Sequence, residues 1–103
     1  MEMGRKEMAK GYWLVQTDIS DQAGHQKYLE MNRPVLRRYG AKLLVRSEQR
    51  EIVEGTCRSR HLVIEFPDYE AALSCYHSEE YQEARKRRLD NTVADIAIVE
   101  GCP

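Results

Sequence analysis

The stretch from Arg60 to Arg88, RHLVIEFPDYEAALSCYHSEEYQEARKRR, places the tightest limits on what this chain can fold into. Its first residues, Arg60–Phe66, are rich in apolar and β-branched side chains and predict a strand. Pro67 ends that strand, because proline has no amide hydrogen for a sheet ladder and fixes its own φ angle. Asp68 is a suitable N-cap for a helix that starts at once. We therefore expect a strand that turns directly into a helix.

Side chains alternate across a strand, so this strand has two different faces. One face carries Leu62, Ile64 and Phe66, and the other carries His61, Val63 and Glu65. The segment Tyr12–Thr17 is aromatic and β-branched and predicts another strand, with few polar residues on either face. Such a strand is typical of a sheet that has helices on one side and a partner's sheet on the other.

Helical spacing of apolar residues follows the central strand and also precedes it. After Asp68 we expect a helix that breaks near His77, where Ser78 caps a second helix with Tyr81, Ala84, Arg85 and Arg88 on its inner face. Ser20 or Asp21 caps the earlier helix, which is kinked by Pro34 and stopped by Gly40. Its inner face carries His25, Tyr28, Leu29, Asn32, Leu36 and Tyr39.

The remaining strands complete an α+β order of β-α-β-β-α-β. We expect strands at Lys42–Arg46 and Asp95–Glu100, and a short additional strand at Glu51–Glu54. The resulting fold is a four-stranded antiparallel sheet with helices on one face, and the second helical region is split in two. At 103 residues the chain makes one domain, 10–103, after a flexible leader, 1–9. The uncovered sheet face predicts a face-to-face homodimer.

The composition excludes several classes of protein. Lys and Arg number 16 against 17 Asp and Glu, which argues against a dedicated nucleic-acid binder. No apolar run reaches the length of a membrane span, and the first residues lack the apolar core of a signal peptide. The three cysteines are widely spaced, as expected of reduced thiols. We therefore expect a cytoplasmic protein that binds neither membranes nor nucleic acids.

Several short segments of the sequence resemble one known family. They are KGYWLVQTDISD, YGAKLLVR, EIVEG, VIEFPDYEAALSCYHSEEYQEARKRR and DIAIVEG, in this order and spacing. The chain resembles the domain-of-unknown-function family numbered 1330 from about Lys10 to Gly101. That family is similar to the dimeric α/β-barrel, ferredoxin-like proteins. The resemblance implies this fold and a homodimer, but it selects no chemistry, because the superfamily includes monooxygenases, isomerases, haem enzymes and ligand sensors.

One set of polar side chains predicts a ligand site between the helices and the sheet. The set is Tyr28, Asn32, Arg46, Glu65, Tyr81 and Arg88. Arg46 or Arg88 would hold a carboxylate, and Glu65 would act as a general base if burial raised its pKa. The structural alternative is a buried pair of Glu65 and Arg88 that the tyrosine hydroxyls satisfy. Asn32 would bind the ligand or satisfy the backbone near Pro34.

The histidines and cysteines give further candidates. His77, at the predicted helix break, is the best single residue for proton transfer, although such a residue commonly only caps a helix. The spacing of His25, His61 and His77 fits no metal motif, so we expect no metal site. Cys57 lies beside Arg58 and Arg60, which can activate a thiol, but a spectator role is the simpler interpretation.

These observations predict chemistry on a small organic or aromatic acid, of monooxygenase or isomerase type, without a cofactor. The catalytic candidates are Glu65 and His77, and the ligand-binding candidates are Tyr28, Asn32, Arg46, Tyr81 and Arg88. The alternative function is a non-catalytic module for small-ligand binding or dimerisation.

Overall fold

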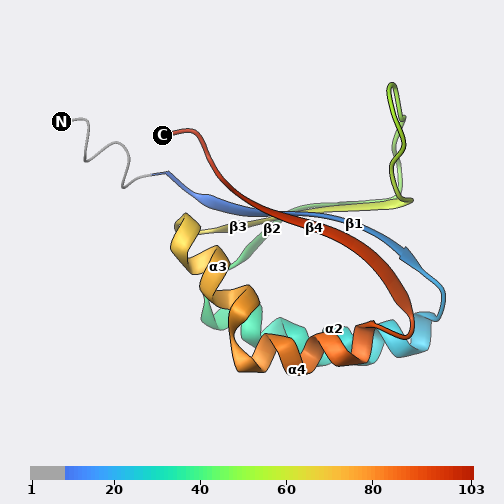
Figure 1. Cartoon of the computed structure of the whole chain (residues 1–103), viewed down its shortest axis with the longest axis horizontal. Coiled ribbons are helices and arrows are strands. Elements are labelled where there is room, and N and C mark those ends of the chain that lie inside the picture. Colours follow the sequence, from blue (N-terminus) through green and yellow to red (C-terminus); the bar gives the residue numbers. More distant parts are fainter. Residues whose placement is uncertain (1–8) are drawn as a thin grey trace.

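The computed structural model describes residues 9–103 and has one sheet with helices on one side (Figure 1). Its elements are β1 (Gly11–Ile19), α2 (Gln22–Arg38), β2 (Lys42–Ser47), β3 (Arg60–Phe66), α3 (Tyr69–His77), α4 (Glu79–Arg88) and β4 (Thr92–Glu100). The strand order is β2-β3-β1-β4, and every pair is antiparallel. The predicted fold and the split second helical region are confirmed.

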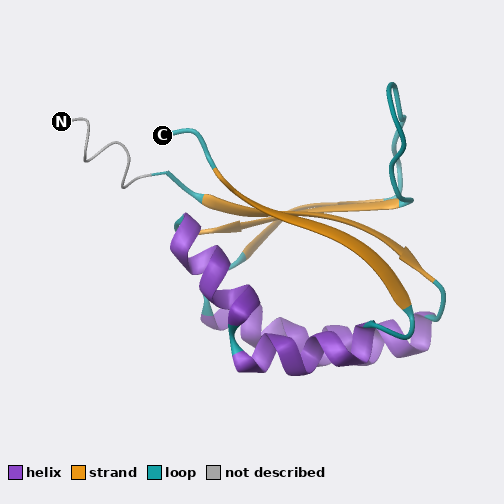
Figure 2. Cartoon of the chain, viewed as in Figure 1, coloured by secondary structure: helices purple, strands orange, loops and turns teal. Residues whose placement is uncertain are grey.

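The two faces of the sheet have different surroundings (Figure 2). All three helices lie on one side, where Trp13, Ile64 and Phe66 are buried. On the other side the strands leave Leu14 and Val93 largely exposed, at 42% and 55%. The loop 48–59, green in Figure 1, rises on this second side, away from the helices. We call the second side the open face.

The core is built around Trp13 of β1, which is 1% exposed. Its indole nitrogen donates a hydrogen bond of 2.9 Å to the carbonyl oxygen of Ala72 in α3. Its ring lies 5.3 Å from Phe66 and 5.1 Å from Tyr81, between ring centroids. Aromatic pairs at such separations add about 0.5–1.5 kcal/mol each to the gain from burial. These contacts fix α3 and the start of α4 against β1 and β3.

Local signals in the sequence set several helix ends. The Asp68 carboxylate accepts a 2.8 Å hydrogen bond from the Ala71 amide, and the Ser78 hydroxyl accepts one of 3.1 Å from Tyr81. Both predicted caps are thereby confirmed. Gly40 follows α2 with φ at +76°, the left-handed conformation that glycine adopts without a steric penalty. At the other end of α2, Asp21 is the N-cap residue, but its side chain makes no capping hydrogen bond.

Three expectations about the elements need correction or lie outside the structure. No strand forms at Glu51–Glu54, because the pairing of β2 with β3 ends at Ser47 and His61 and the chain between them leaves the sheet. The last strand begins at Thr92, three residues earlier than expected. The predicted leader lies outside the described residues apart from Ala9, which is buried.

No helix in residues 9–103 is long and apolar enough to span a membrane.

Candidate ligand-binding cavity

A cavity of about 250 Å³ lies between the sheet and the helices α2 and α4. All four strands and both helices contribute to its lining. Much of the wall is apolar, from Trp13, Val15, Leu29, Leu36, Leu43, Leu62, Ile64, Ala94 and Ile96. Its volume falls just below the range of about 300–1,000 Å³ for pockets that hold drug-sized molecules. The cavity therefore has room for a small molecule with an apolar body.

The charged side chains around this cavity are all positive. Among the described residues that line it, none is acidic and five are arginines: Arg33, Arg37, Arg46, Arg60 and Arg88. The first three are exposed and mark the open end, whereas Arg88 is only 5% exposed and lies inside. Positive charges in a confined, partly apolar site attract an anion more strongly than the same charges in water.

Three buried polar atoms at this cavity have no hydrogen-bond partner among residues 9–103. They are Thr17 Oγ1, Asn32 Oδ1 and Arg88 Nε. The guanidinium of Arg88 does lie over the ring of Tyr28, with 5.6 Å between Cζ and the ring centroid. Leaving a buried polar group unpaired costs about 1–3 kcal/mol, and more for a charged group. Arg88 Nε and the Thr17 hydroxyl can donate to an anion in the cavity, whereas Asn32 Oδ1 can only accept and requires a donor on the bound molecule.

Two tyrosines join the helices across the inner end of the cavity. The hydroxyls of Tyr28 in α2 and Tyr81 in α4 lie 3.0 Å apart and share a hydrogen bond. Burial, followed by the neighbouring Tyr81, raises the pKa of Tyr28 well above its ordinary value. The Tyr28 hydroxyl therefore keeps its proton at neutral pH. Because the shared bond uses one proton, the other remains available to a ligand.

His25 also lines the cavity, and sequence reasoning did not include it among the site residues. Its Nδ1 lies 2.9 Å from the hydroxyl of Thr92, at the start of β4. Burial is the largest cause that lowers the pKa of His25, and the positive charges of Arg60 and Arg88 lower it further. The position of His25 in the inner-face spacing of α2 was the only sequence signal that could have identified it.

The structure brings five of the predicted site residues together and leaves two apart. Tyr28, Asn32, Arg46, Tyr81 and Arg88 all line the cavity. Their role in ligand binding stays a prediction. Glu65 and His77 are not among the lining residues. The cluster expected from the sequence therefore forms without its proposed proton-transfer groups.

Strand alternation explains the position of Glu65. Its neighbours Ile64 and Phe66 face the helices, so its side chain lies on the open face, where it accepts a 3.0 Å hydrogen bond from the Tyr12 hydroxyl. The predicted pair with Arg88 does not form. His77 is the last residue of α3 and is exposed, with its ring edge-on to Tyr76. The catalytic role of either residue stays a prediction that this cavity does not support.

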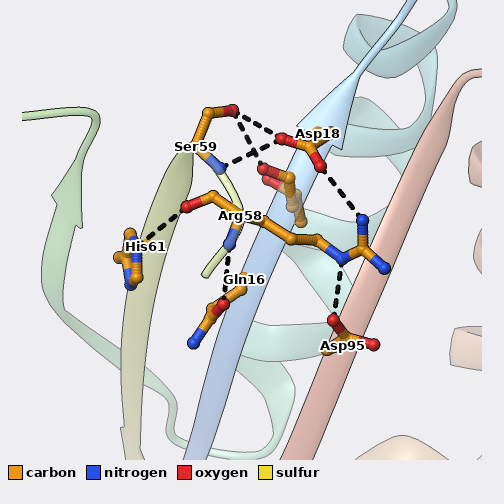
Figure 3. A network of polar contacts seen from close by, with 7 residues as sticks. Gln16, Asp18, Arg58, Ser59, His61 and Asp95 are labelled. Carbon is orange, nitrogen blue, oxygen red and sulfur yellow. Dashed lines mark hydrogen bonds and ion pairs between the residues drawn. The ribbon is translucent and has the colours of Figure 1, made fainter. Parts of the chain in front are cut away.

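A separate polar cluster holds the base of the loop 48–59 against the open face (Figure 3). Arg58 pairs with Asp95 of β4 at 2.7 Å and with Asp18 of β1 at 3.0 Å. The Ser59 hydroxyl and amide both donate to Asp18, at 2.8 and 3.0 Å. The Ser59 hydrogen bonds, followed by Arg58, lower the pKa of Asp18. The cluster joins the loop to β1 and β4, and none of its residues lines the cavity.

The cysteines show no arrangement typical of a metal or redox site. Cys57 and Cys102 are exposed, whereas Cys75 is part of the core. Burial raises the pKa of Cys75 to about 12, so this thiol stays protonated. Within the described part of the chain, no three His, Cys, Asp or Glu side chains are placed to hold a metal ion.

The four-stranded antiparallel sheet, the helices on one face and the cavity between them define a ferredoxin-like α+β protein. The chain belongs to the family described as domain of unknown function (DUF1330), whose model matches residues 10–102. This membership agrees with the resemblance found in the sequence. No curated protein matches the chain significantly.

Solved structures with the same architecture share little sequence with this chain. RPA0582 from Rhodopseudomonas palustris, a protein of unknown function, has a TM-score of 0.74 at 14% identity. The match covers 93% of this chain and 85% of the RPA0582 chain. SnoaB from Streptomyces nogalater, a cofactor-independent oxygenase, has a TM-score of 0.62 at 8% identity, with coverages of 88% and 91%. A dimeric ferredoxin-like protein of unknown function from Bacteroides fragilis NCTC 9343 has a TM-score of 0.56 at 11% identity, with coverages of 88% and 95%. These similarities establish the fold alone.

Proposed function

We propose that the cavity between the sheet and α2 and α4 binds a small organic or aromatic acid. One observation carries the proposal: five arginines, no acidic residue and three unpartnered buried polar atoms meet in one partly apolar cavity. The described structure contains no protein group that neutralises Arg88, which is buried. A carboxylate would supply that missing charge.

The lining also favours an acid with an apolar body. Arginine binds a carboxylate through two parallel hydrogen bonds, so Arg88 can hold such a group inside the cavity. Asn32 and Thr17 can orient the polar part of the ligand, while leucine and isoleucine side chains contact the rest of it. Arg33, Arg37 and Arg46, at the exposed end, attract the anion as it enters.

The proposal includes cofactor-free chemistry on this acid, of isomerase or monooxygenase type. The ferredoxin-like neighbour SnoaB, described as a cofactor-independent oxygenase, supports only the compatibility of the fold with such chemistry. The alternative is a non-catalytic binding module, for which the bound acid would be recovered unchanged. Product analysis of each ligand that binds separates the two functions.

A thermal stability screen with small carboxylic acids tests the binding proposal. A ligand that binds only the native state stabilises it by about 2.7 kcal/mol at a concentration a hundredfold above Kd. We expect aromatic and aliphatic carboxylates to stabilise the protein and the matching amides to have no effect. Asn32→Ala should weaken the response, whereas Arg87→Met, an exposed position on the same helix as Arg88, should not. Equal responses to acids and amides would contradict the proposal.

As a further part of the proposed function, we infer that the chain forms a homodimer through the open face. Leu14, Val45 and Val93 are 42%, 42% and 55% exposed on this face, and Val99 adds to the apolar surface. The loop 48–59 rises beside the face and exposes Val53 at 78%, so a second copy could bury both surfaces. The Bacteroides fragilis neighbour is described as dimeric, which supports a dimer for this architecture.

Light scattering after size exclusion tests the dimer. We expect twice the 12.0 kDa mass of one chain for the wild type and a single chain for Leu14→Lys. Met31→Lys places the same charge at an exposed residue of α2 and serves as the control, with its dimer intact. A monomeric wild type, or a dimer that survives Leu14→Lys, would refute this interface.

A further inference from the structure

His25 is a buried histidine at the cavity, with only one ring edge engaged. It lies in the first turns of α2, is 6% exposed, and has Nδ1 at 2.9 Å from Thr92 Oγ1. Its Nε2 makes no hydrogen bond within residues 9–103. Because the ring lines the cavity, Nε2 is the nitrogen available to a bound molecule. The protonation of this nitrogen decides what it can do there.

A chain of hydrogen bonds fixes the tautomer of His25. The side-chain amide of Asn91 donates from Nδ2 to the carbonyl oxygen of Arg87 at 2.6 Å, so its Oδ1 can only accept. The Thr92 hydroxyl donates its single proton to that Oδ1 at 2.8 Å. Thr92 therefore has only a lone pair to offer His25, and the hydrogen between them belongs to Nδ1. Nε2 is left with a free lone pair.

The surroundings keep the imidazole neutral as well. Burial lowers the pKa of His25, and Arg60 of β3 and Arg88 of α4 lower it further, because a second positive charge is unfavourable beside them. Within α2, the neighbouring aromatic ring is that of Tyr28, 5.4 Å away between centroids, and its hydroxyl is protonated and neutral. No acidic residue lines this cavity among the described residues to restore the charge. A neutral imidazole with a free Nε2 is a proton acceptor at pH 7.

We propose that His25 Nε2 is the general base of this cavity and removes a proton from the carbon next to the carbonyl group of a bound carbonyl acid. The proposal rests on the proposed function, because the arginines must first hold the carboxylate. The geometry that carries it is the shared cavity and the Thr92–Asn91–Arg87 hydrogen-bond chain.

The step is balanced without an oxidant. The C–H bond breaks, its electron pair forms the carbon–carbon double bond of an enolate, and the carbonyl π electrons move to oxygen. The proton bonds to Nε2 and gives an imidazolium. The spare hydroxyl proton of the Tyr28–Tyr81 pair and the cavity arginines can stabilise the enolate oxygen. Return of the proton to the same or another carbon completes an enolisation or an isomerisation.

The first test needs no ligand. Nitrogen-15 NMR of labelled protein at pH 7 should show His25 as a neutral imidazole protonated at Nδ1. Thr92→Val removes the acceptor that selects this tautomer, so the Nδ1 preference should fall in that variant. A neutral ring protonated at Nε2, or an imidazolium, in the wild type would overturn the proposal.

The second test follows hydrogen exchange at carbon in phenylpyruvate, an aromatic 2-oxo acid. In D₂O the protein should accelerate deuterium incorporation at its CH₂ group, as measured by proton NMR. General base catalysis contributes about 10²–10⁴-fold, so His25→Gln should lower the rate by at least about a hundredfold while phenylpyruvate still stabilises the variant. His61→Gln, on the open face, is the matched control and should retain the wild-type rate.

The outcomes separate the two proposals. If phenylpyruvate and the other carboxylates fail to stabilise the wild type, the anion site is wrong and the base proposal falls with it. If carboxylates bind but phenylpyruvate does not, the carbonyl-acid class is wrong, and the base proposal is overturned alone. If phenylpyruvate binds and its exchange rate is the same with His25→Gln as with wild type, the binding site stands and His25 is not its base.

Discussion

Replacing Arg88 by methionine separates a structural role of this residue from a role in ligand binding. Methionine has a similar unbranched length but no charge, so it can fill most of the same volume. If Arg88 stabilises the fold, its replacement should lower the free energy of unfolding of the ligand-free protein. If Arg88 instead binds an anion, its replacement should lower only the stabilisation that the anion provides.

The expected magnitudes follow from the contacts of Arg88. The variant loses the contact with the Tyr28 ring, which contributes about 2 kcal/mol because both groups are buried. It also removes the buried, unpartnered Nε, whose burial costs about 1–3 kcal/mol. The stability of the ligand-free variant should therefore lie within about 1 kcal/mol of wild type, in either direction. A hydrogen bond to a charged group contributes about 1.5–3 kcal/mol, so carboxylate affinity should fall about 10- to 150-fold.

Urea unfolding with and without a carboxylate ligand, at one fixed protein concentration, measures both quantities. Arg87→Met is the control, because that arginine is exposed on the same helix and should change neither value by more than about 0.5 kcal/mol. A loss of more than about 2 kcal/mol in ligand-free Arg88→Met would show that the guanidinium stabilises the fold by itself. An unchanged ligand affinity would remove Arg88 from the site.

Three further predictions concern the core, the loop cluster and the cysteines. Phe66→Ala should cost about 3–5 kcal/mol in urea unfolding, because Phe66 is fully buried against Trp13; a loss below about 1 kcal/mol would contradict this packing. The lowered pKa of Asp18 contributes stability above the unfolded value of about 3.9, and this contribution is lost as pH falls through the folded value. Asp18→Asn should therefore flatten the loss of stability between about pH 5 and pH 2, and an unchanged slope would refute the assignment. Iodoacetamide at pH 8 should add two groups to the native chain, at Cys57 and Cys102, and a third at Cys75 only after unfolding; native modification of Cys75 by intact mass would show that the core opens readily.

The central stretch shows how much of the fold can be predicted from local sequence. Arg60–Phe66, Asp68 and Ser78 gave the strand and both caps correctly, because these features depend on neighbours within a few residues. Glu51–Glu54 looked equally suitable for a strand, but a strand needs a partner, and the pairing of β2 and β3 has already ended at Ser47. A short β-prone segment cannot reveal from its own residues whether an edge is available.

The sequence predicted some residues of the candidate site correctly and misplaced others. The alternation in β3 already set Glu65 opposite Ile64 and Phe66, yet the hypothesis grouped it with polar residues of the helix inner faces as a candidate general base. The helical spacing placed Tyr28, Asn32, Tyr81 and Arg88 on inner faces, and all four line the cavity. The chemical type of a side chain was thus a poorer guide to proximity than periodicity, because periodicity is a property of the backbone.

By itself, the sequence determined the order of the elements, their inner and outer faces and the family to which the chain belongs. Only the tertiary structure decided that five arginines meet without an acid, and that Thr92 and Asn91 give His25 a free Nε2. Element order and faces follow from local hydrogen bonding and backbone period. A side chain's charge balance and tautomer follow from partners 67 residues away in the chain, which only the packing of α2 against the start of β4 brings within 2.9 Å.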